Sequence, residues 1–342
     1  MVLKKLTEAF GPSGFEDEIR QVIYEEVKPY ADHVYTDALG SLIVEKNPGA
    51  KGTKILLAAH MDEVGFMIVN IEDNGLLRFR PLGGVDPRIL VSKVVRVGEK
   101  RHFGVIGAKA IHLQQPEERT KPLELNQLYI DIGAKNREQA ENLVEIGDLA
   151  VFATEYEEFG DRRAKSKSFD DRVGCAVLIE LLKQPTTLPL VFAFTVQEET
   201  GLRGAGPVAF RVKPDLAIVV EGTVCFDVAG TPSHAESTKQ GAGPALSVVD
   251  GRTIGHARFR DFIKGVAGEE QIPVQYRRTV GGANDVGAIH LTEMGIISAG
   301  ISVPTRYIHA PAQIIHLDDY ENTIRLISAV LGKIEKGGHP IQ

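Results

Sequence analysis

The chain has 342 residues, of which 43% are hydrophobic and 25% charged; this length favours two domains, because a single domain usually contains one to two hundred residues. A net charge of −7 leaves no basic surplus to neutralise phosphates, so we expect no nucleic-acid partner. The sequence has no apolar run of signal-peptide or membrane-span length and only two cysteines, which favours a cytoplasmic protein without a membrane partner.

The first sixty residues predict a helix followed by a buried strand. Ser13-Gly-Phe-Glu16 has the pattern of a capping box, and apolar residues then recur at helical spacing up to Val27. Residues 54–60, KILLAAH, are almost all apolar, which is typical of a strand covered on both faces. We therefore expect His60 at the carboxyl end of a buried strand.

The pattern changes between Val64 and Lys165 to short alternating runs with glycine and Asn-Gly turns, interrupted by one helical stretch at 136–144. From Ser166 onward, helices and strands alternate, which predicts an α/β domain with a partly parallel sheet. The main predicted elements of this part are a helix at 171–182, strands at 188–197 and 216–222, and a final helix from Asp318. We expect residues 1–63 and 166–342 to form one α/β domain, with 64–165 as an inserted β-rich domain.

Two pairs of polar residues lie at the ends of predicted elements, one at the end of a strand and one at the start of a helix. His60 and Asp62 can project to the same side of their strand, as an imidazole ligand with a carboxylate behind it. Asp170 and Asp171 begin a helix, where they either cap its amides or offer Asp170 as a carboxylate shared by two cations. In the second case we expect Arg172 to restrain Asp171.

Further carboxylates and a histidine follow other strands. Glu198 and Glu199 end the strand at 188–197, where successive side chains point in opposite directions, so we assign Glu199 to a metal and Glu198 to general-base work. Glu221 ends another apolar strand and His309 follows a third apolar run, although a solvated strand end and a core histidine explain them equally well in isolation. Two neighbouring acids are alternative ligands, Asp215 and Asp227.

The combination is more informative than any single motif. Imidazole and carboxylate ligands suit zinc, cobalt or manganese. Two such ions in one site activate a water and polarise a carbonyl. The set therefore favours a hydrolase with two co-catalytic metals.

The sequence resembles metallopeptidase family 42, the tetrahedral aminopeptidases and relatives labelled glutamyl aminopeptidase or endoglucanase, over essentially its whole length. The resemblance rests on these segments, in this order: GPSGFEDEIR, AAHMDEVGFM, RPLGGVDPRILVSKVVRV, YIDIGA, KSFDDRVGCA, TVQEETGLRGA, GGANDVGAI and RYIHAP. It implies a three-layer α/β/α metallopeptidase domain with an inserted, small, PDZ-like β-barrel domain. It also implies self-association through the inserted domain into homo-oligomers, either dimers or a dodecamer.

The family resemblance implies a metal-dependent aminopeptidase that acts on peptides with a free N-terminus. Two divalent ions per subunit, zinc or cobalt, would activate the water, with Glu198 as general base and Asp62 behind His60. Five residues would hold the ions: His60, Asp170 and Glu221 the first, and Asp170, Glu199 and His309 the second. At position 221 many relatives have an aspartate, so Glu221 is a departure from the family pattern.

Two alternative functions are an endoglucanase-type glycoside hydrolase and a catalytically silent assembly protein of the same fold. Glycosidases use two carboxylates beside the sugar bond and need no metal cluster, so the two histidines argue against the first. The presence of every expected ligand and the base argues against the second.

Overall fold

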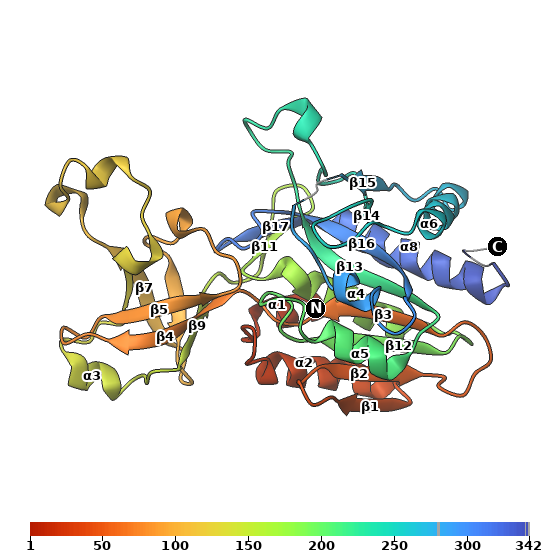
Figure 1. Cartoon of the computed structure of the whole chain (residues 1–342), viewed down its shortest axis with the longest axis horizontal. Coiled ribbons are helices and arrows are strands. Elements are labelled where there is room, and N and C mark those ends of the chain that lie inside the picture. The colour runs from red at the N-terminus through yellow and green to blue at the C-terminus, as the bar shows by residue number, and fades with distance from the viewer. Residues whose placement is uncertain (279–280, 339, 341–342) are drawn as a thin grey trace.

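The computed structural model describes residues 1–278, 281–338 and 340 (Figure 1). The larger lobe contains an 11-stranded sheet flanked by helices, and the smaller lobe contains a closed β-barrel. The predicted three-layer α/β/α domain with an inserted small barrel is thus confirmed. None of the helices in the described part of the chain is both long and apolar enough to cross a membrane.

The large sheet has a parallel centre and antiparallel edges. Across the sheet the strands are β1 (His33–Thr36), β2 (Leu42–Lys46), β12 (Leu190–Thr195), β3 (Ile55–His60), β13 (Leu216–Val224), β16 (Ile297–Arg306), β17 (Gln313–His316), β11 (Arg163–Ser166) and β10 (Glu157–Phe159), with β14 (Ala245–Ser247) between β16 and β15 (Gln275–Arg277). β12, β3, β13 and β16 run parallel, and Thr195 pairs with His60. The carboxyl ends of these strands therefore meet at one edge, where open α/β sheets commonly bind ligands.

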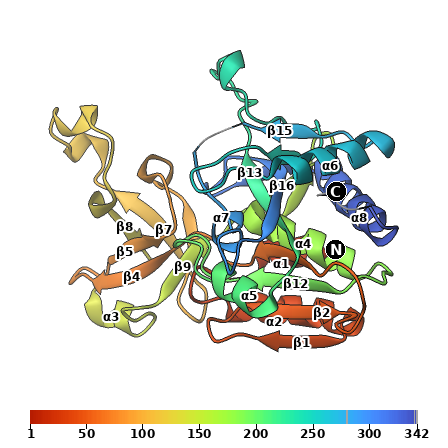
Figure 2. The ribbon, with the colours of Figure 1, turned by 45° about the vertical axis from the view of Figure 1, so that its right-hand side comes forward.

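Helices cover both faces of this sheet (Figure 2). One face carries α1 (Val2–Glu8), α2 (Asp17–Val27), α4 (Phe169–Leu182), α6 (Ala257–Glu269) and α8 (Leu317–Glu335), and the other carries α5 (Ala205–Val212) and α7 (Val286–Ile289). The alternation of strand β3 divides its side chains between two cores. Leu57 and Ala59 pack with the first group of helices, and Leu56 and Ala58 pack with the second. This double burial explains why the sequence 54–60 is almost wholly apolar.

The barrel has its own apolar core, in which Phe66 makes edge-to-face contacts with Phe79 and Phe152 at centroid distances of 4.9 and 5.4 Å. It is built from β4 (Gly65–Ile71), β5 (Leu77–Leu82), β6 (Val94–Val97), β7 (His102–Ala108), β8 (Leu128–Asp131) and β9 (Leu149–Phe152), together with the short helix α3 (Arg137–Glu141). The strands β10 and β11 that follow pair with the large sheet instead. The domain limits 64 and 165 stay a prediction.

The region around the first helices differs from the sequence-based prediction. Helix α1 was not predicted, and it buries Leu3 and Leu6 in the core shared with α4. The capping-box prediction was wrong: α2 begins at Asp17, and the Ser13 hydroxyl donates to the Asp62 carboxylate instead of to helix amides. A capping box is recognised from four neighbouring residues, whereas the partner of Ser13 lies 49 residues away in the sequence.

Candidate active site

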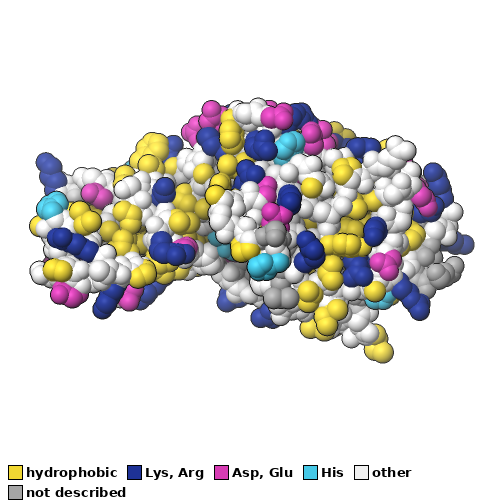
Figure 3. Space-filling model, turned by 90° about the horizontal axis from the view of Figure 1, so that it is seen from above, with side chains coloured by type: hydrophobic (Ala, Val, Ile, Leu, Met, Phe, Trp, Pro, Cys, Tyr) yellow, Lys and Arg dark blue, Asp and Glu magenta, His cyan; other side chains and the backbone are white. Residues whose placement is uncertain are grey.

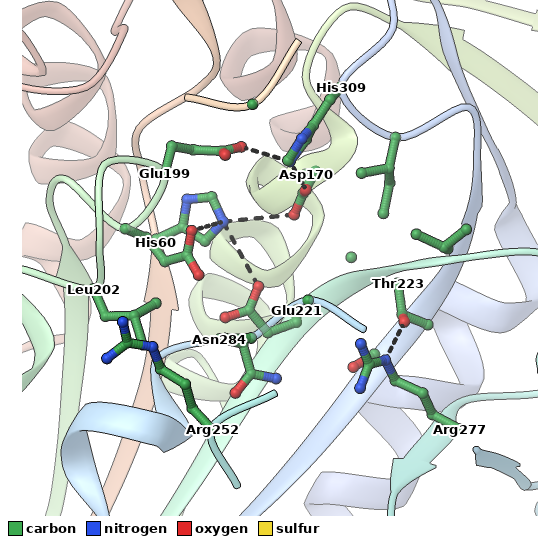
Figure 4. Close-up of a pocket in the computed structure, with 18 of the residues that line it drawn as sticks. His60, Asp170, Glu199, Leu202, Glu221, Thr223, Arg252, Arg277, Asn284 and His309 are labelled. Atoms are coloured by element: carbon green, nitrogen blue, oxygen red, sulfur yellow. Dashed lines mark hydrogen bonds and ion pairs between the residues drawn. The ribbon is translucent and has the colours of Figure 1, made fainter. Parts of the chain in front are cut away.

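A cavity of about 310 Å³ lies at the carboxyl ends of the central strands (Figure 4). Six of the residues that the sequence predicted for the site line this cavity: His60, Asp170, Glu198, Glu199, Glu221 and His309. They come from five separate segments of the chain. The fold therefore brings together residues that the sequence only suggested one motif at a time.

Three of these residues lie on or beside the parallel strands. His60 is the last residue of β3 and is 1% exposed. Glu221 was expected at the end of its strand, but β13 continues to Val224 and keeps its pairing with β16 throughout. A carboxylate held inside a paired strand has little freedom to move away from the cavity. His309 lies in the turn after β16, with a left-handed φ of 59°.

Glu198 and Glu199 do not end a strand, contrary to the prediction, because β12 stops at Thr195. They lie in the loop between β12 and α5, so strand alternation does not set their directions. Backbone hydrogen bonds close this loop on itself, including Leu202 N–H to the Glu198 carbonyl at 2.9 Å. Both carboxylates nevertheless line the cavity.

Asp170 stands between the two histidines (Figure 4). Its Oδ1 lies 3.5 Å from His60 Nε2, and its Oδ2 lies 3.3 Å from His309 Nε2. Glu221 Oε2 is 3.6 Å from the same His60 nitrogen, and Glu199 Oε1 is 3.1 Å from the His309 nitrogen. The side chains thus form two groups that share one carboxylate.

Asp171 is a further acid near the cluster that was not among the predicted ligands. Ligand atoms of His60, Asp171 and Glu221 converge closely enough to hold an ion, as do those of His60, Asp170 and Glu199. However, Asp171 already accepts hydrogen bonds from the backbone N–H groups of His60 and Gly174, at 3.2 and 3.0 Å. The oxygens of Asp170 face imidazole nitrogens, so Asp170 is the better placed of the two.

Arg172 does not restrain Asp171, and that prediction was wrong. Its guanidinium is fully buried and donates to the carbonyls of Leu6, Ala9 and Gly11. The side chain therefore ties the start of α4 to α1. These carbonyls lie more than 160 residues earlier in the chain, beyond the reach of a local motif.

Asp62 stands behind His60. Its Oδ1 lies 3.4 Å from His60 Nδ1, the ring nitrogen that does not face Asp170, and the Asp62 carbonyl is 3.1 Å from the same nitrogen. The carboxylate also accepts hydrogen bonds from Ser13 and from the backbone of Glu198 and Glu199. Asp62 therefore orients both an imidazole and the loop that carries two further acids.

The electrostatics of the cavity follow from crowding acids in a buried place. Burial, together with neighbouring carboxylates, raises the pKa of Glu198 and of Glu221 well above the usual value. Burial opposes ionisation of Asp170, but hydrogen bonds from the two histidines hold its pKa below the usual range. Burial alone would lower the pKa of His309, yet Glu199 and Asp170 raise it to about 11. The cavity is thus strongly attractive to positive charge.

These residues fit divalent metal ions. Glu221 Oε1 is buried and accepts no hydrogen bond from the described residues, and an unpartnered buried acceptor is unusual. Imidazole nitrogens and carboxylate oxygens are the donors that zinc and cobalt accept. Positive ions would also offset the repulsion among the carboxylates.

The remaining predicted acids do not enter the cavity. Asp215 lies just before the opposite end of β13 and accepts the Lys54 N–H, and Asp227 forms an ion pair with Arg306 at 2.8 Å. Two charged residues of the cavity lining were missed from the sequence, Arg252 and Arg277. Arg252 lies in a bend between the bridged residues Val249 and Ile254, and Arg277 ends a short strand, and neither carries a motif that would have marked it.

The sequence profile of the M42 glutamyl aminopeptidase family matches residues 40–326. The chain belongs to this family. As an M42 family member it is a peptidase, and the resemblance found in the sequence is confirmed. Among its relatives, a protein of Acetivibrio thermocellus is 43% identical over 95% of this chain and 96% of its own length. The lysyl aminopeptidase of Pyrococcus furiosus is 30% identical over 98% of this chain and 97% of that protein.

Solved structures agree with this assignment. A TET aminopeptidase from Thaumarchaeota archaeon SCGC AB-539-E09 has 38% identity and a TM-score of 0.94, covering 98% of this M42 peptidase and 97% of that chain. The TET1 peptidase of Pyrococcus horikoshii, which can assemble into a tetrahedron or a large octahedral shell, has 35% identity and a TM-score of 0.85, covering 96% and 97%. A Thermotoga maritima structure described as an endoglucanase has 37% identity and a TM-score of 0.81, covering 98% of both chains.

Proposed function

We propose that this M42 peptidase is a metal-dependent aminopeptidase with two divalent ions, zinc or cobalt, in one site. His60, Asp170 and Glu221 would hold one ion, and Asp170, Glu199 and His309 would hold the other. The observation that carries this proposal is the position of Asp170, whose two oxygens face different histidines at 3.5 and 3.3 Å. Bound ions would supply the positive charge that makes a water acidic and polarises the scissile carbonyl.

Glu198 is the proposed general base. Its carboxylate lines the cavity, is 11% exposed, and lies 3.9 Å from His60 Nε2. Among the six predicted residues that line the cavity, Glu198 is the acid that belongs to neither proposed ligand set. Glu198 takes a proton from a water in the cavity and returns it to the departing amine, a role that commonly contributes two to four decades of rate. Asp62 holds His60 by its other nitrogen throughout.

A peptide with a free amino terminus is the proposed substrate. Glu198, the cavity acid that the ions leave free, offers a negative charge to an ammonium group, and a volume of about 310 Å³ has room for a terminal residue. The glucanase alternative has support only from the descriptions of solved structures, the Thermotoga endoglucanase and a second one whose description names both a peptidase and an endoglucanase. A glycosidase needs two carboxylates across a sugar bond, and the imidazole pair sharing Asp170 has no part in that chemistry.

Self-association through the inserted barrel is part of the proposal. Val94, Phe103 and Val105 are 45, 60 and 45% exposed; Val94 pairs with Val105 across β6 and β7, and Phe103 lies two residues from Val105 on β7. Seen from above, the barrel lobe carries many hydrophobic side chains on its surface (Figure 3). The Pyrococcus peptidase forms closed shells, and a related TET1 structure is a dodecamer. A cytoplasmic location stays a prediction from the sequence.

The test is metal-reconstituted kinetics on a panel of aminoacyl amides, N-acetylated counterparts and a soluble glucan, with and without chelator. We expect hydrolysis of substrates with a free amino group, loss of activity with chelator, and recovery with zinc or cobalt. Glu198→Gln should retain bound metal and lose at least about 100-fold in kcat. Chelator-resistant glucan hydrolysis would support the glycosidase, and two bound ions without any peptide hydrolysis would support the silent protein.

A further inference from the structure

The loop that carries Glu198 and Glu199 has no regular structure to hold it. It leaves β12 after Thr195, and Gln197 adopts a left-handed φ of 56°, which a non-glycine residue rarely does. The positions of the two acids must therefore depend on whatever holds the backbone of residues 197–199.

Three consecutive backbone amides of this loop donate to two buried carboxylates. The N–H of Gln197 donates to Glu16 Oε1 at 3.1 Å. The N–H groups of Glu198 and Glu199 donate to Asp62 Oδ1 and Oδ2, at 3.0 and 3.2 Å. The side chains of Glu16 and Asp62 are buried, so these bonds are shielded from water.

The amino-terminal segment GPSGFE orients both carboxylates. The Ser13 hydroxyl donates to Asp62 Oδ2 at 2.5 Å, and the Gly14 N–H donates to Glu16 Oε1 at 2.7 Å. The segment itself is fixed to the chain beyond β3, because Ser13 N–H donates to the Glu63 carbonyl at 3.3 Å and Pro12 forms a parallel bridge with Glu63. One short segment thus contacts both groups that hold the loop.

We propose that Ser13 and Glu16 are positioning residues for the general base. Ser13 acts through Asp62 on the backbone of Glu198 and Glu199, and Glu16 accepts directly from the Gln197 amide. Neither residue lines the cavity, so neither touches the substrate. The inference rests on the proposed function, in which Glu198 moves the proton. A displacement of the base by about 1 Å is enough to cost on the order of 100-fold in rate.

The experiment combines kinetics with hydrogen exchange on the metal-loaded protein. Ser13→Ala and Glu16→Ala should each lower kcat at least about 10-fold with KM changed by less than about 2-fold, because the base is displaced and binding is not. Glu16→Gln retains an oxygen that accepts from both amides, so it should keep kcat within about 3-fold of wild type. In the two alanine variants, amides 197–199 should exchange faster while those of α4 stay protected.

Matched controls separate this role from ordinary stability. Ser166 is a buried serine whose hydroxyl lies 3.4 Å from the Thr7 carbonyl, and Ser166→Ala should retain kcat. An active wild type with unchanged kcat in both alanine variants would overturn the positioning role. So would a fall in kcat without faster exchange at 197–199. A wild type inactive on every aminoacyl substrate refutes the proposed function instead, and the exchange data then decide the positioning of the loop alone.

Discussion

At Glu16, burial separates a carboxyl group from water, and no cation of the described residues pairs with it. Burial, with the nearby Asp62 charge, raises the pKa of Glu16 to about 7, although backbone N–H groups oppose the shift. The folded protein therefore holds this proton more tightly than the unfolded chain does. Between pH 4.5 and 7 the free energy of unfolding should fall as pH rises, because the folded state binds more protons in that window.

Glu16→Gln removes this titration and keeps the acceptor oxygen. Relative to wild type, we expect the variant to gain about 2–3 kcal/mol in the free energy of unfolding between pH 4.5 and 7.5. Urea titrations of the metal-free protein across that range measure the difference. Glu18→Gln is the control. Burial would raise the pKa of Glu18, but the Phe10 N–H and Arg101 outweigh burial and lower it. The stability difference between this variant and wild type should therefore change with pH in the opposite direction. A pH-independent difference for Glu16→Gln contradicts the account.

Arg252 brings a positive charge to a cavity that several acids line. It is exposed and lines the cavity, and its guanidinium makes no hydrogen bond or ion pair within the described part of the chain. A charged group of this kind favours a substrate carboxylate within reach. Arg252→Met should lower kcat/KM for glutamyl and aspartyl substrates about 10-fold relative to alanyl substrates. Arg211→Met, on α5 and stacked on Tyr35, is the control, and an equal loss for all substrates refutes the prediction.

At the scale of elements, the site depends on how α1 docks against α4. Arg172 is the connection, with a fully buried guanidinium 2.6 Å from the Leu6 carbonyl. Arg172→Leu would remove the donor to the buried Leu6 carbonyl and the buried ion pair with Glu63 at 3.4 Å, so we expect a loss of about 3–5 kcal/mol in unfolding free energy. Lys5→Gln removes only a surface pair with Glu26 and should cost less than about 1 kcal/mol. Similar losses for both variants in denaturant titrations contradict this interpretation of Arg172.

The elements also show where sequence reasoning succeeds. Strand β3 and the position of His60 follow from an unbroken apolar run, because burial on both faces leaves that trace in the sequence. The proposed roles of Ser13 and Glu16 cannot be read from the sequence, because their hydrogen-bond partners lie 49 and 181 residues away. The sequence Ser13-Gly-Phe-Glu16 fits a capping box, although in the fold both side chains make long-range hydrogen bonds instead. The same limit applies to Arg172, Arg252 and Arg277, whose neighbours only the fold supplies.

For the whole molecule, the layered fold was predictable from alternating strands and helices. The proposed assembly surface was not, because its exposed side chains are brought together only in the folded barrel. Phe103 is 60% exposed on β7, and Arg96 stacks on its ring. Phe103→Glu should lower the particle mass in analytical ultracentrifugation toward that of one chain, because a buried charge at an apolar contact is costly. Leu39→Glu, in an exposed turn before β2, should leave the mass unchanged. An unchanged mass for Phe103→Glu excludes this surface as the contact.

The most direct test of the central proposal is the number of metal ions bound per chain, measured by elemental analysis after equilibration with zinc or cobalt. Wild type and Glu198→Gln should each hold two ions. Asp170→Ala should hold close to none, because its carboxylate belongs to both groups, whereas His309→Ala should retain one. Two ions in Asp170→Ala, or none in wild type, would contradict a site built on a shared Asp170.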